Sequence, residues 1–276
     1  MKKSQKTQNG HNEPELIGSA AFVTKHWQMA QSMKNSAGSI LITGEPGTGK
    51  THLAHYLCYH CASAPKIPQT IWLDEIEEAL LEHELFGYFD ENRLEHEGKI
   101  LSKSPCSVIL KNIEHLPLHL QAKVLHMIET REFARIGGEK FIKVDTRVIC
   151  TTSAQLPQLV VEKRFRQDLY YLLSAGQIVM QPLRKRKADI KALGQYFLLK
   201  AAHAQNKRLG RFTAEALNAL KNYAWPGNVR ELKAEIEQLV ALAEPHQQVA
   251  TAQDISAKVR FQYPPFEQAQ STRHHG

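Results

Sequence analysis

Gly44-Glu45-Pro46-Gly47-Thr48-Gly49-Lys50-Thr51 is the stretch that decides the fold, and it closely follows a short apolar run at Ser39 to Ile42. The stretch matches the phosphate-binding pattern G-x-x-x-x-G-K-[ST] at every fixed position. Its glycines allow successive backbone N–H groups to turn toward a polyphosphate, and Lys50 adds a positive charge at the outer phosphates. Thr51 offers a hydroxyl to Mg²⁺ at the start of the next helix. The pattern therefore predicts a strand, a loop and a helix that bind a nucleotide.

The composition is that of a folded protein with one large domain and a small satellite, since the chain has 276 residues and 42% hydrophobic content. No apolar run approaches the roughly 20 residues that span a bilayer. The polar start of the chain, Met1 to Glu15, lacks the apolar centre of a signal peptide. Because the chain also has only four cysteines, we expect a cytoplasmic protein that does not enter a membrane.

The net charge of +7 is spread along the chain, and Lys and Arg gather in two basic runs, Lys163 to Arg166 and Arg184 to Lys187. Phe165 is the single aromatic residue in these runs, so neither has the repeated aromatic residues of a nucleic-acid platform. We therefore interpret both runs as a solvated face or a subunit contact rather than as a DNA-binding surface.

Short runs rich in β-branched residues alternate with longer amphipathic segments up to Met180, which is typical of a parallel sheet with helical crossovers. The candidate strands are Ser39 to Ile42, Thr70 to Leu73, Ser107 to Leu110, Thr146 to Thr151 and Gln177 to Met180. Three helical segments follow, at Ala188 to about Gln205, Thr213 to Tyr223 and Gly227 to about Ala243. We predict an α/β nucleotide-binding domain followed by a small three-helix lid.

Five stretches in a fixed order make the signal more specific. They are Leu16-Ile17-Gly18-Ser19, Gly44 to Thr51, Glu84-Leu85-Phe86-Gly87, Leu116 to Leu125, and Trp225-Pro226-Gly227-Asn228-Val229-Arg230-Glu231-Leu232. With them the chain resembles, over about residues 16–243, the central AAA+ domain of the bacterial enhancer-binding proteins, the ATPases that remodel sigma-54 RNA polymerase. The resemblance implies an α/β AAA+ P-loop NTPase fold with a five-stranded parallel sheet and a small C-terminal helical lid. It divides the chain into a flexible tail at 1–15, the nucleotide-binding domain at 16–183, the lid at 184–248 and a tail at 249–276.

The resemblance also implies which residues contact the nucleotide. ATP or ADP would be bound by Gly44, Glu45, Pro46, Gly47, Thr48, Gly49, Lys50 and Thr51, together with Ile17 and Arg230. Mg²⁺, where it is bound, would be held by Thr51. Arg166 stands at the position of an arginine that reaches the nucleotide of a neighbouring subunit, so an oligomer is expected.

Several catalytic positions of the family carry other residues in this chain. The family has an Asp-Glu pair at the end of its third strand, where Asp orders the Mg²⁺ shell and Glu polarises the attacking water. This chain has Lys111-Asn112 there. The sensor asparagine after the fourth strand is Ser153, which reaches less far, and the second inter-subunit arginine is Leu172. The family has a longer loop here, and a Phe-Thr pair in that loop contacts the sigma factor. In this chain the shorter segment at 88–97 lacks the pair, so contact with the sigma factor is not implied.

A second acidic pair, Asp74-Glu75, also follows an apolar run. The resemblance assigns that run to the second strand, at the edge of the sheet, and strands ~4.8 Å apart would hold Asp74 beyond metal-ligand distance. We interpret the pair as favourable charges in the first turn of a helix, with a catalytic role as the alternative.

Two positions are also open to the Lys111 ammonium. It lies either near the phosphates and Thr51, where it would replace part of the Mg²⁺ charge, or outward with its stem along the sheet.

The residues that bind nucleotide are thus retained, whereas those that hydrolyse it are lost. This pattern predicts a hydrolysis-defective, nucleotide-binding pseudoenzyme that regulates transcription through protein contacts, with an intact enhancer-binding protein or sigma-54 RNA polymerase as its partner. The alternatives are an active ATPase that remodels sigma-54 RNA polymerase and a scaffold of the same fold that binds no nucleotide. The residues after Ala243 are too few for a DNA-binding domain, so we expect no specific DNA binding by this chain alone.

Overall fold

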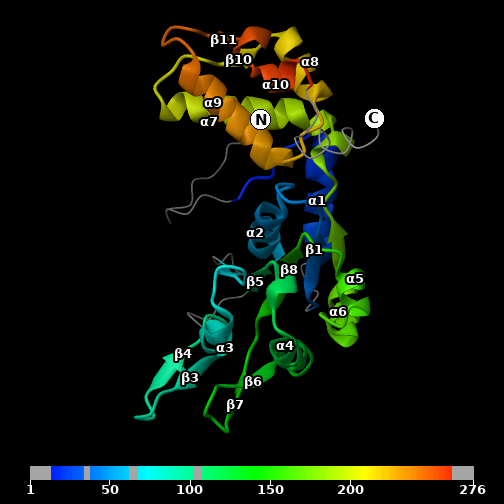
Figure 1. The fold of residues 1–276 in the computed structure, drawn as a ribbon, viewed down its shortest axis with the longest axis vertical. Helices are drawn as coiled ribbons and strands as arrows, with labels where there is room; N and C mark the ends of the chain where they lie inside the picture. Colours follow the sequence, from blue (N-terminus) through cyan, green and yellow to red (C-terminus); the bar gives the residue numbers. More distant parts are fainter. Residues whose placement is uncertain (1–13, 34–37, 62–67, 102–106, 263–276) are drawn as a thin grey trace, which may run out of the picture.

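The computed structural model describes residues 14–33, 38–61, 68–101 and 107–262. The molecule is elongated, with the helical lid at one end, the parallel sheet in the middle and two short hairpins at the other end (Figure 1). Most of the tail expected at 1–15 lies outside the described residues. No helix within the described ranges is both long enough and apolar enough to cross a membrane.

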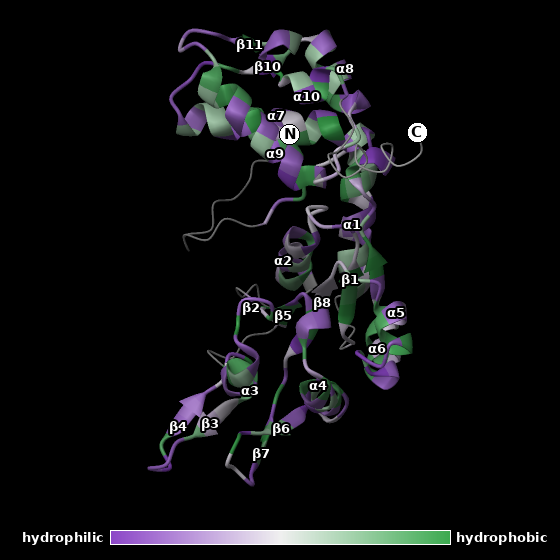
Figure 2. Ribbon diagram, viewed as in Figure 1, coloured by the Kyte–Doolittle hydropathy of each residue, from purple (hydrophilic) through white to green (hydrophobic). Residues whose placement is uncertain are grey.

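The central sheet has five parallel strands in the order β2-β5-β8-β1-β9. The strands are β1 (Ile40–Thr43), β2 (Gln69–Trp72), β5 (Ser107–Lys111), β8 (Arg147–Thr152) and β9 (Gln177–Val179). Each predicted strand is present and is displaced by no more than one residue at either end. The inner strands are buried almost throughout, which explains why they read as continuous apolar runs (Figure 2). The predicted fold class, a five-stranded parallel sheet with a helical lid, is confirmed.

Helices cover both faces of the sheet because alternate strand residues point to opposite sides. Ile42 and Ile109 belong to a buried cluster with α1 and α2 on one face. The neighbouring Leu41 and Leu110 pack with the other four helices of this domain on the opposite face. The helices are α1 (Ala20–Met33), α2 (Lys50–Cys61), α3 (Glu78–Phe86), α4 (Leu118–Thr130), α5 (Leu156–Val161) and α6 (Gln167–Ser174). The loop at Gly44 to Thr51 therefore connects an inner strand to a helix that packs directly on the sheet.

The lid begins with the short helix η2 (Leu183–Lys185) and contains the three predicted helices, α7 (Ala188–Ala204), α8 (Ala214–Asn222) and α9 (Asn228–Leu242). It continues with β11 (Val249–Ala250), which pairs with β10 (Arg211–Phe212), and with η3 (Ala252–Asp254) and α10 (Ala257–Arg260). Ala250, Ile255 and Val259 are buried in the lid core. The lid thus extends beyond the boundary expected at 248, because elements this short show no periodic pattern in the sequence.

Two β-hairpins project from the sheet domain and have no counterpart among the predicted elements. In the first, β3 (Gly87–Phe89) pairs with β4 (Glu95–Glu97), and in the second, β6 (Glu132–Ala134) pairs with β7 (Phe141–Lys143). A bridge between Tyr88 and Ile136 joins the two hairpins. Strands of three residues are too short for alternation to be detected. The segment at 88–97 is therefore a compact hairpin.

Candidate functional site

The lysine of the phosphate-binding loop is folded back onto the loop itself. Lys50 Nζ donates to the carbonyl oxygens of Gly44 at 2.7 Å and Glu45 at 3.0 Å, and to Ser153 Oγ at 2.8 Å. Burial lowers the pKa of Lys50 to about 8, and the Glu114 carboxylate opposes this shift. All three ammonium donors are thus used within this cradle. A bound phosphate would have to replace some of these acceptors.

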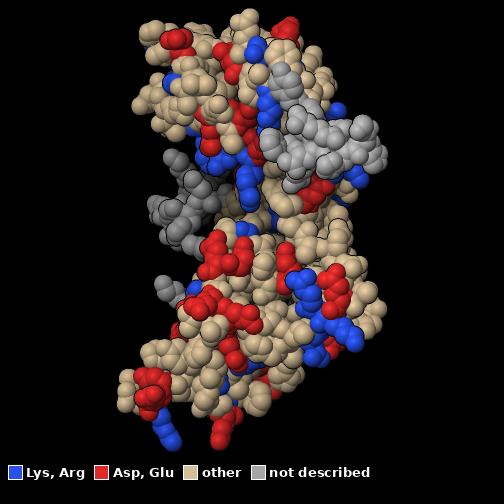
Figure 3. Space-filling view, viewed as in Figure 1, with Lys and Arg blue, Asp and Glu red and all other residues tan. Residues whose placement is uncertain are grey.

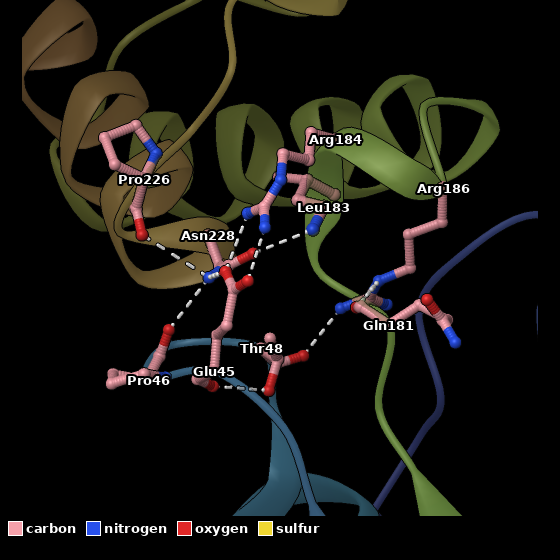
Figure 4. A network of polar contacts seen from close by, with 9 residues as sticks. All are labelled: Glu45, Pro46, Thr48, Gln181, Leu183, Arg184, Arg186, Pro226 and Asn228. Atoms are coloured by element: carbon pink, nitrogen blue, oxygen red, sulfur yellow. Dashed lines mark hydrogen bonds and ion pairs between the residues drawn. The ribbon is translucent and has the colours of Figure 1, made fainter. Parts of the chain in front are cut away.

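The lid contacts the loop through a polar network (Figure 4). Arg184 makes two hydrogen bonds to the Glu45 carboxylate, at 2.7 and 2.5 Å, and holds the pKa of that carboxyl below its ordinary value. Asn228 Nδ2 donates to Glu45 Oε2 at 3.2 Å and to the Pro46 carbonyl at 3.0 Å. Asn228 Oδ1 accepts from the backbone N–H of Leu183 at 2.7 Å. The buried Asn228 amide therefore joins the loop, the lid and the segment between the two domains.

Gly47 lies against the start of α9. The backbone N–H groups of Val229 and Arg230 donate to the Gly47 carbonyl, at 2.9 and 3.3 Å. Gly47 has φ +77°, and a Cβ at this position would lie 2.2 Å from the carbonyl oxygen of Gly227. Any side chain would therefore strain the backbone and push the lid away. This glycine is needed for the lid contact as well as for the loop turn.

Arg186 connects the lid to the loop and to α1. Its guanidinium donates to the Thr48 carbonyl at 2.6 Å and to Asp189 Oδ2 at 3.3 Å, and it lies 4.9 Å from the centroid of the Phe22 ring. Arg184 and Arg186 thus both belong to the interface between the lid and the loop. The interpretation of the run at 184–187 as a solvated face or subunit contact is wrong for Arg186, which is largely buried, whereas Arg184 stays exposed while it pairs with Glu45.

A cavity of about 390 Å³ lies between the loop, the lid and the segment that precedes α1. The residues that line it include Ile17, Phe22, Met180, Phe197 and Val229, next to Thr48 and Gly49 of the loop. The backbone N–H of Ser19 donates to the buried Asp189 carboxylate at 2.8 Å, which holds this segment against α7. A largely apolar cavity beside a phosphate-binding loop suits a planar base.

The position at the end of β5 that the family gives to a carboxylate is occupied by Lys111, and its side chain turns toward the edge strand. Lys111 Nζ lies 3.0 Å from the centroid of the Trp72 ring on the neighbouring edge strand. Burial lowers the pKa of Lys111, and the carboxylates of Asp74 and Glu75 oppose this shift. Of the two positions open to this ammonium, the structure has the outward one, stabilised by a cation–π contact.

Asp74 and Glu75 lie in an exposed turn that follows β2. Helix α3 begins only at Glu78, so the expectation that the pair occupies the first turn of a helix is wrong. Strand β2 is at the edge of the sheet, with β5 and β8 between it and β1. At ~4.8 Å per strand this places β2 roughly 14 Å from the loop strand, which supports the interpretation that the pair does not hold a metal at the loop.

A carboxylate that the motifs did not single out lies close to the loop lysine. Asn112 has a left-handed backbone, with φ +57°, and leads into η1 (Ile113–His115). Within η1, Glu114 Oε1 accepts from the backbone N–H of Ser153 at 3.3 Å. Although Ser153 is shorter than the asparagine of the family, its hydroxyl reaches Lys50. An acidic residue in the turn after a buried strand was the only signal for Glu114 in the sequence.

Arg166 is exposed at the start of α6, away from the loop of its own chain. Its guanidinium pairs with Asp168 at 3.1 and 2.7 Å, and its backbone N–H donates to the buried Gln121 side chain at 2.7 Å. Gln121 also donates to the Arg164 carbonyl at 3.1 Å, so α4 positions this basic run. Figure 3 shows basic side chains gathered over α5 and α6. Leu172 is half-buried on α6.

The oxygen atoms around the loop are of the kind that Mg²⁺ prefers. Thr51 follows Lys50 in the first turn of α2. The Oε2 atom of Glu114 is buried and has no hydrogen-bond partner within the described part of the chain. These two residues offer oxygen atoms that suit a hard cation. The Lys111 ammonium lies over Trp72, although its charge still adds to the effect of burial that lowers the pKa of Lys50.

The fold and the site together define the class of protein. A parallel sheet with a glycine-rich loop between β1 and α2, and a helical lid seated on that loop, is the arrangement of an AAA+ nucleotide-binding module. Residues 16–179 match the sigma-54 interaction domain, and residues 184–272 match the AAA+ ATPase lid domain. The chain therefore belongs to the family of sigma-54 activator-type AAA+ proteins.

Curated relatives agree with this assignment. The chain is 33% identical over 233 residues to the nitrogen fixation protein AnfA of Azotobacter vinelandii, an overlap that covers 83% of this chain and 44% of the relative. It is 38% identical over 213 residues to the transcriptional regulatory protein ZraR of Klebsiella oxytoca, covering 75% and 48%. The chain thus spans about half the length of the curated relatives it matches.

A similar solved structure is that of NtrX from Brucella abortus. Its complex with ATP has a TM-score of 0.78 at 27% identity and covers 95% of this chain and 59% of NtrX. Its complex with ADP has the same TM-score at 26% identity, covering 96% and 60%. The arrangement of sheet and lid is therefore one that occurs in NtrX with either nucleotide bound.

Proposed function

We propose that this chain is an ATP- or ADP-binding AAA+ regulatory protein that turns nucleotide over slowly or not at all and acts on transcription through protein contacts. The observation that carries the proposal is the contrast within one site. The loop and the cavity beside it suit a nucleotide, and the Arg230 charge acts on Lys50. Lys111 and Asn112, in contrast, stand where catalytic carboxylates are expected, and the Lys111 side chain turns toward Trp72.

Nucleotide binding is supported by three features of the site. The loop has the full phosphate-binding pattern, an apolar cavity large enough for a base lies beside it, and the lid contacts the loop at Gly47 and Glu45. NtrX, with a similar fold, has been solved with ATP and with ADP. We propose that the base enters the cavity beside Ile17 and that the phosphates displace the carbonyl partners of Lys50.

Weak turnover follows from the chemistry of phosphoryl transfer. Hydrolysis depends on charge stabilisation at the outer phosphate and on positioning of the attacking water. A lysine whose ammonium lies over an indole ring supplies neither function. Asn112, a neutral amide, is a poor base for activating water.

We propose that the chain acts by joining another protein, either an intact sigma-54 activator or the sigma-54 RNA polymerase itself. The match to the sigma-54 interaction domain supports this class of partner. The exposed Arg166 at the start of α6 supports assembly into an oligomer. Size-exclusion chromatography with light scattering, with and without an intact activator and ATP, tests the proposal. Separate elution of both proteins under all conditions, together with no binding to the polymerase, would contradict it.

The nucleotide proposal is tested by calorimetric titration with ATP and ADP and by a phosphate-release assay on the same preparation. We expect binding together with turnover far below typical enzyme rates, which are on the order of 1 per second or above. Turnover within that typical range would show that the chain is an active ATPase. Absence of binding to either nucleotide would favour the scaffold alternative.

Lys50→Ala is the matched variant for this test. We expect it to abolish measurable binding, because Lys50 is the cation at the centre of the loop. Lys191→Ala, an exposed lysine on α7, serves as the control and should bind as the wild type does. Equal affinities of the two variants would mean that nucleotide binds elsewhere.

A further inference from the structure

Glu114 is connected to the loop lysine through one residue, Ser153. The Ser153 backbone N–H donates to Glu114 Oε1 at 3.3 Å, and the Ser153 hydroxyl accepts from Lys50 Nζ at 2.8 Å. Burial is the main cause of the lowered Lys50 pKa, and among charged groups the Glu114 carboxylate affects that pKa most, ahead of Arg230. The carboxylate is therefore close enough to the centre of the loop to act on charges bound there.

The second oxygen of Glu114 is not used by the fold. Oε2 is buried and has no hydrogen-bond donor among the residues that the structure describes. Burying a carboxylate oxygen without a donor is costly, so such an atom calls for an explanation. One explanation is a bound ligand, or a water molecule ordered by that ligand, which would supply the missing hydrogen-bond donor to Oε2.

Thr151 provides an independent observation at the same edge of the sheet. Its Oγ1 is also buried without a partner in the described ranges. Thr151 lies near the end of β8, paired in register with Ile42 of β1 and with Lys111 of β5. It shares a sheet face with Ile149, which packs in the cluster that contains α2. Two unused oxygen acceptors thus lie where the strands end beside the loop.

We propose that Glu114 replaces, from a different position in the chain, the metal-organising carboxylate that is missing at Lys111. With nucleotide bound, Glu114 Oε2 would accept hydrogen bonds from the water shell of a Mg²⁺ ion held by Thr51 and the outer phosphates. The inference rests on the proposed nucleotide binding. It predicts that the affinity for nucleotide depends on Mg²⁺. If the Lys111 ammonium replaced the metal charge instead, the affinity for nucleotide would depend little on Mg²⁺.

The variant that tests this role is Glu114→Gln, with affinity for a non-hydrolysable ATP analogue measured by calorimetry with Mg²⁺ and with a chelator. Gln retains an oxygen that can accept from Ser153 N–H, so a purely structural role would survive the change. We expect Mg²⁺ to tighten binding to the wild-type protein at least about tenfold, and Glu114→Gln to remove most of this gain, since outer-shell partners of metals typically contribute about 10- to 100-fold.

A direct readout of the metal uses Mn²⁺ in place of Mg²⁺. Electron paramagnetic resonance of free Mn²⁺ gives its affinity for the protein saturated with the same analogue. We expect Glu114→Gln to bind Mn²⁺ about tenfold or more weakly than the wild type. Asp74→Asn is the matched carboxylate-to-amide control in the exposed turn after β2, and it should leave the Mn²⁺ affinity unchanged.

The outcomes separate the two proposals. If the wild-type protein binds the analogue equally well with Mg²⁺ and with a chelator, the Glu114 inference is overturned while nucleotide binding stands, and this result needs no variant to fold. Unchanged metal affinity in a folded Glu114→Gln protein overturns the inference as well. If no nucleotide binds under any condition, both the proposed function and the Glu114 inference fail.

Discussion

At the scale of single residues, Lys111 shows how one substitution removes a metal-binding carboxylate from the catalytic motif of the family. It stands at the end of a buried strand where a carboxylate is expected, and its ammonium lies 3.0 Å from the centroid of the Trp72 ring. Its register partner on β8 is Thr151, whose hydroxyl is buried without a partner among the described residues. The cation is thus held over the edge strand, and only its charge acts on the loop lysine.

Replacing Lys111 should therefore affect Trp72 more than nucleotide binding. For Lys111→Met we expect the nucleotide affinity to stay within about threefold, since the remaining influence of the ammonium is a screened charge effect. We expect stability to fall by at most about 1 kcal/mol, the usual value of an exposed cation–π pair. Tryptophan emission and calorimetric titration measure these effects. A loss of affinity greater than about tenfold would mean that the ammonium reaches the phosphates.

His26 gives the molecule a specific acid sensitivity. Its ring is buried on α1, and Nδ1 donates to the Phe22 carbonyl at 2.8 Å. Burial, helped by the charges of Lys25 and Arg186, lowers the pKa of His26 from its ordinary value of 6.5, while the Phe22 hydrogen bond and Asp189 oppose the shift. The unfolded chain therefore binds a proton more readily than the folded one, so stability is lost as the pH falls below 6.5.

His26→Gln should reduce that acid sensitivity. We expect the free energy of unfolding, measured in urea at about pH 7.5 and 5.5, to change less with pH in the variant, by up to about 1.4 kcal/mol per pH unit for one proton. His119→Gln, which changes an exposed histidine, should keep the wild-type slope. An unchanged slope in His26→Gln would show that this ring does not protonate on unfolding.

At the scale of elements, the junction between the loop and α9 depends on buried rather than exposed polar contacts. Asn228 is fully buried with φ +54°, and its amide serves four backbone or side-chain partners of the loop and lid. The ion pair between Arg184 and Glu45 is exposed on both sides. Exposed pairs contribute about 0–1 kcal/mol, because solvent screens them and both side chains must be ordered.

Asn228→Ala should therefore destabilise the lid much more than Arg184→Ala does. Alanine leaves the buried Leu183 N–H without an acceptor and adopts a left-handed backbone poorly, so we expect a loss of about 2–4 kcal/mol. For Arg184→Ala we expect less than about 1 kcal/mol. Hydrogen exchange of the α9 amides in both variants measures the difference. Equal protection of α9 in the two variants would contradict this account of the junction.

The elements that the sequence predicts well are those with long or continuous patterns. The five sheet strands lie within one residue of their predicted bounds, because buried parallel strands are continuous apolar runs. The hairpins and β11 have strands of only two or three residues, which show no period. Glu114 could not be placed from spacing alone, since the left-handed Asn112 redirects the chain before η1. The contact between Ser153 and Lys50 forms because β8 lies next to β1 in the sheet. A local sequence pattern does not reveal the order of strands in a sheet.

At the scale of the whole molecule, the sheet domain and the lid meet at the phosphate-binding loop. The lid contains more of the chain than its three main helices. The lid core includes Ala250, Ile255 and Val259 from the segment after residue 248. Ser256 also donates through its backbone N–H and hydroxyl to Glu235 on α9, at 2.7 and 2.9 Å. The chain between 249 and 260 is thus part of the structure that holds α8 and α9 together.

A chain that ends at residue 248 should consequently lose its lid, whereas one that ends at 262 should keep it. Burial of an Ile or Val side chain contributes about 1.5–3 kcal/mol, so removing Ile255 and Val259 costs several kcal/mol, comparable to the total stability of a small domain. Trp225 is fully buried in the lid core, and its Nε1 donates to the Leu220 carbonyl at 2.7 Å, so its emission reports on this unit. We expect red-shifted emission and a lower unfolding midpoint for the 1–248 chain, and wild-type values for the 1–262 chain. Identical midpoints and emission in the two chains would instead place the end of the lid at 248.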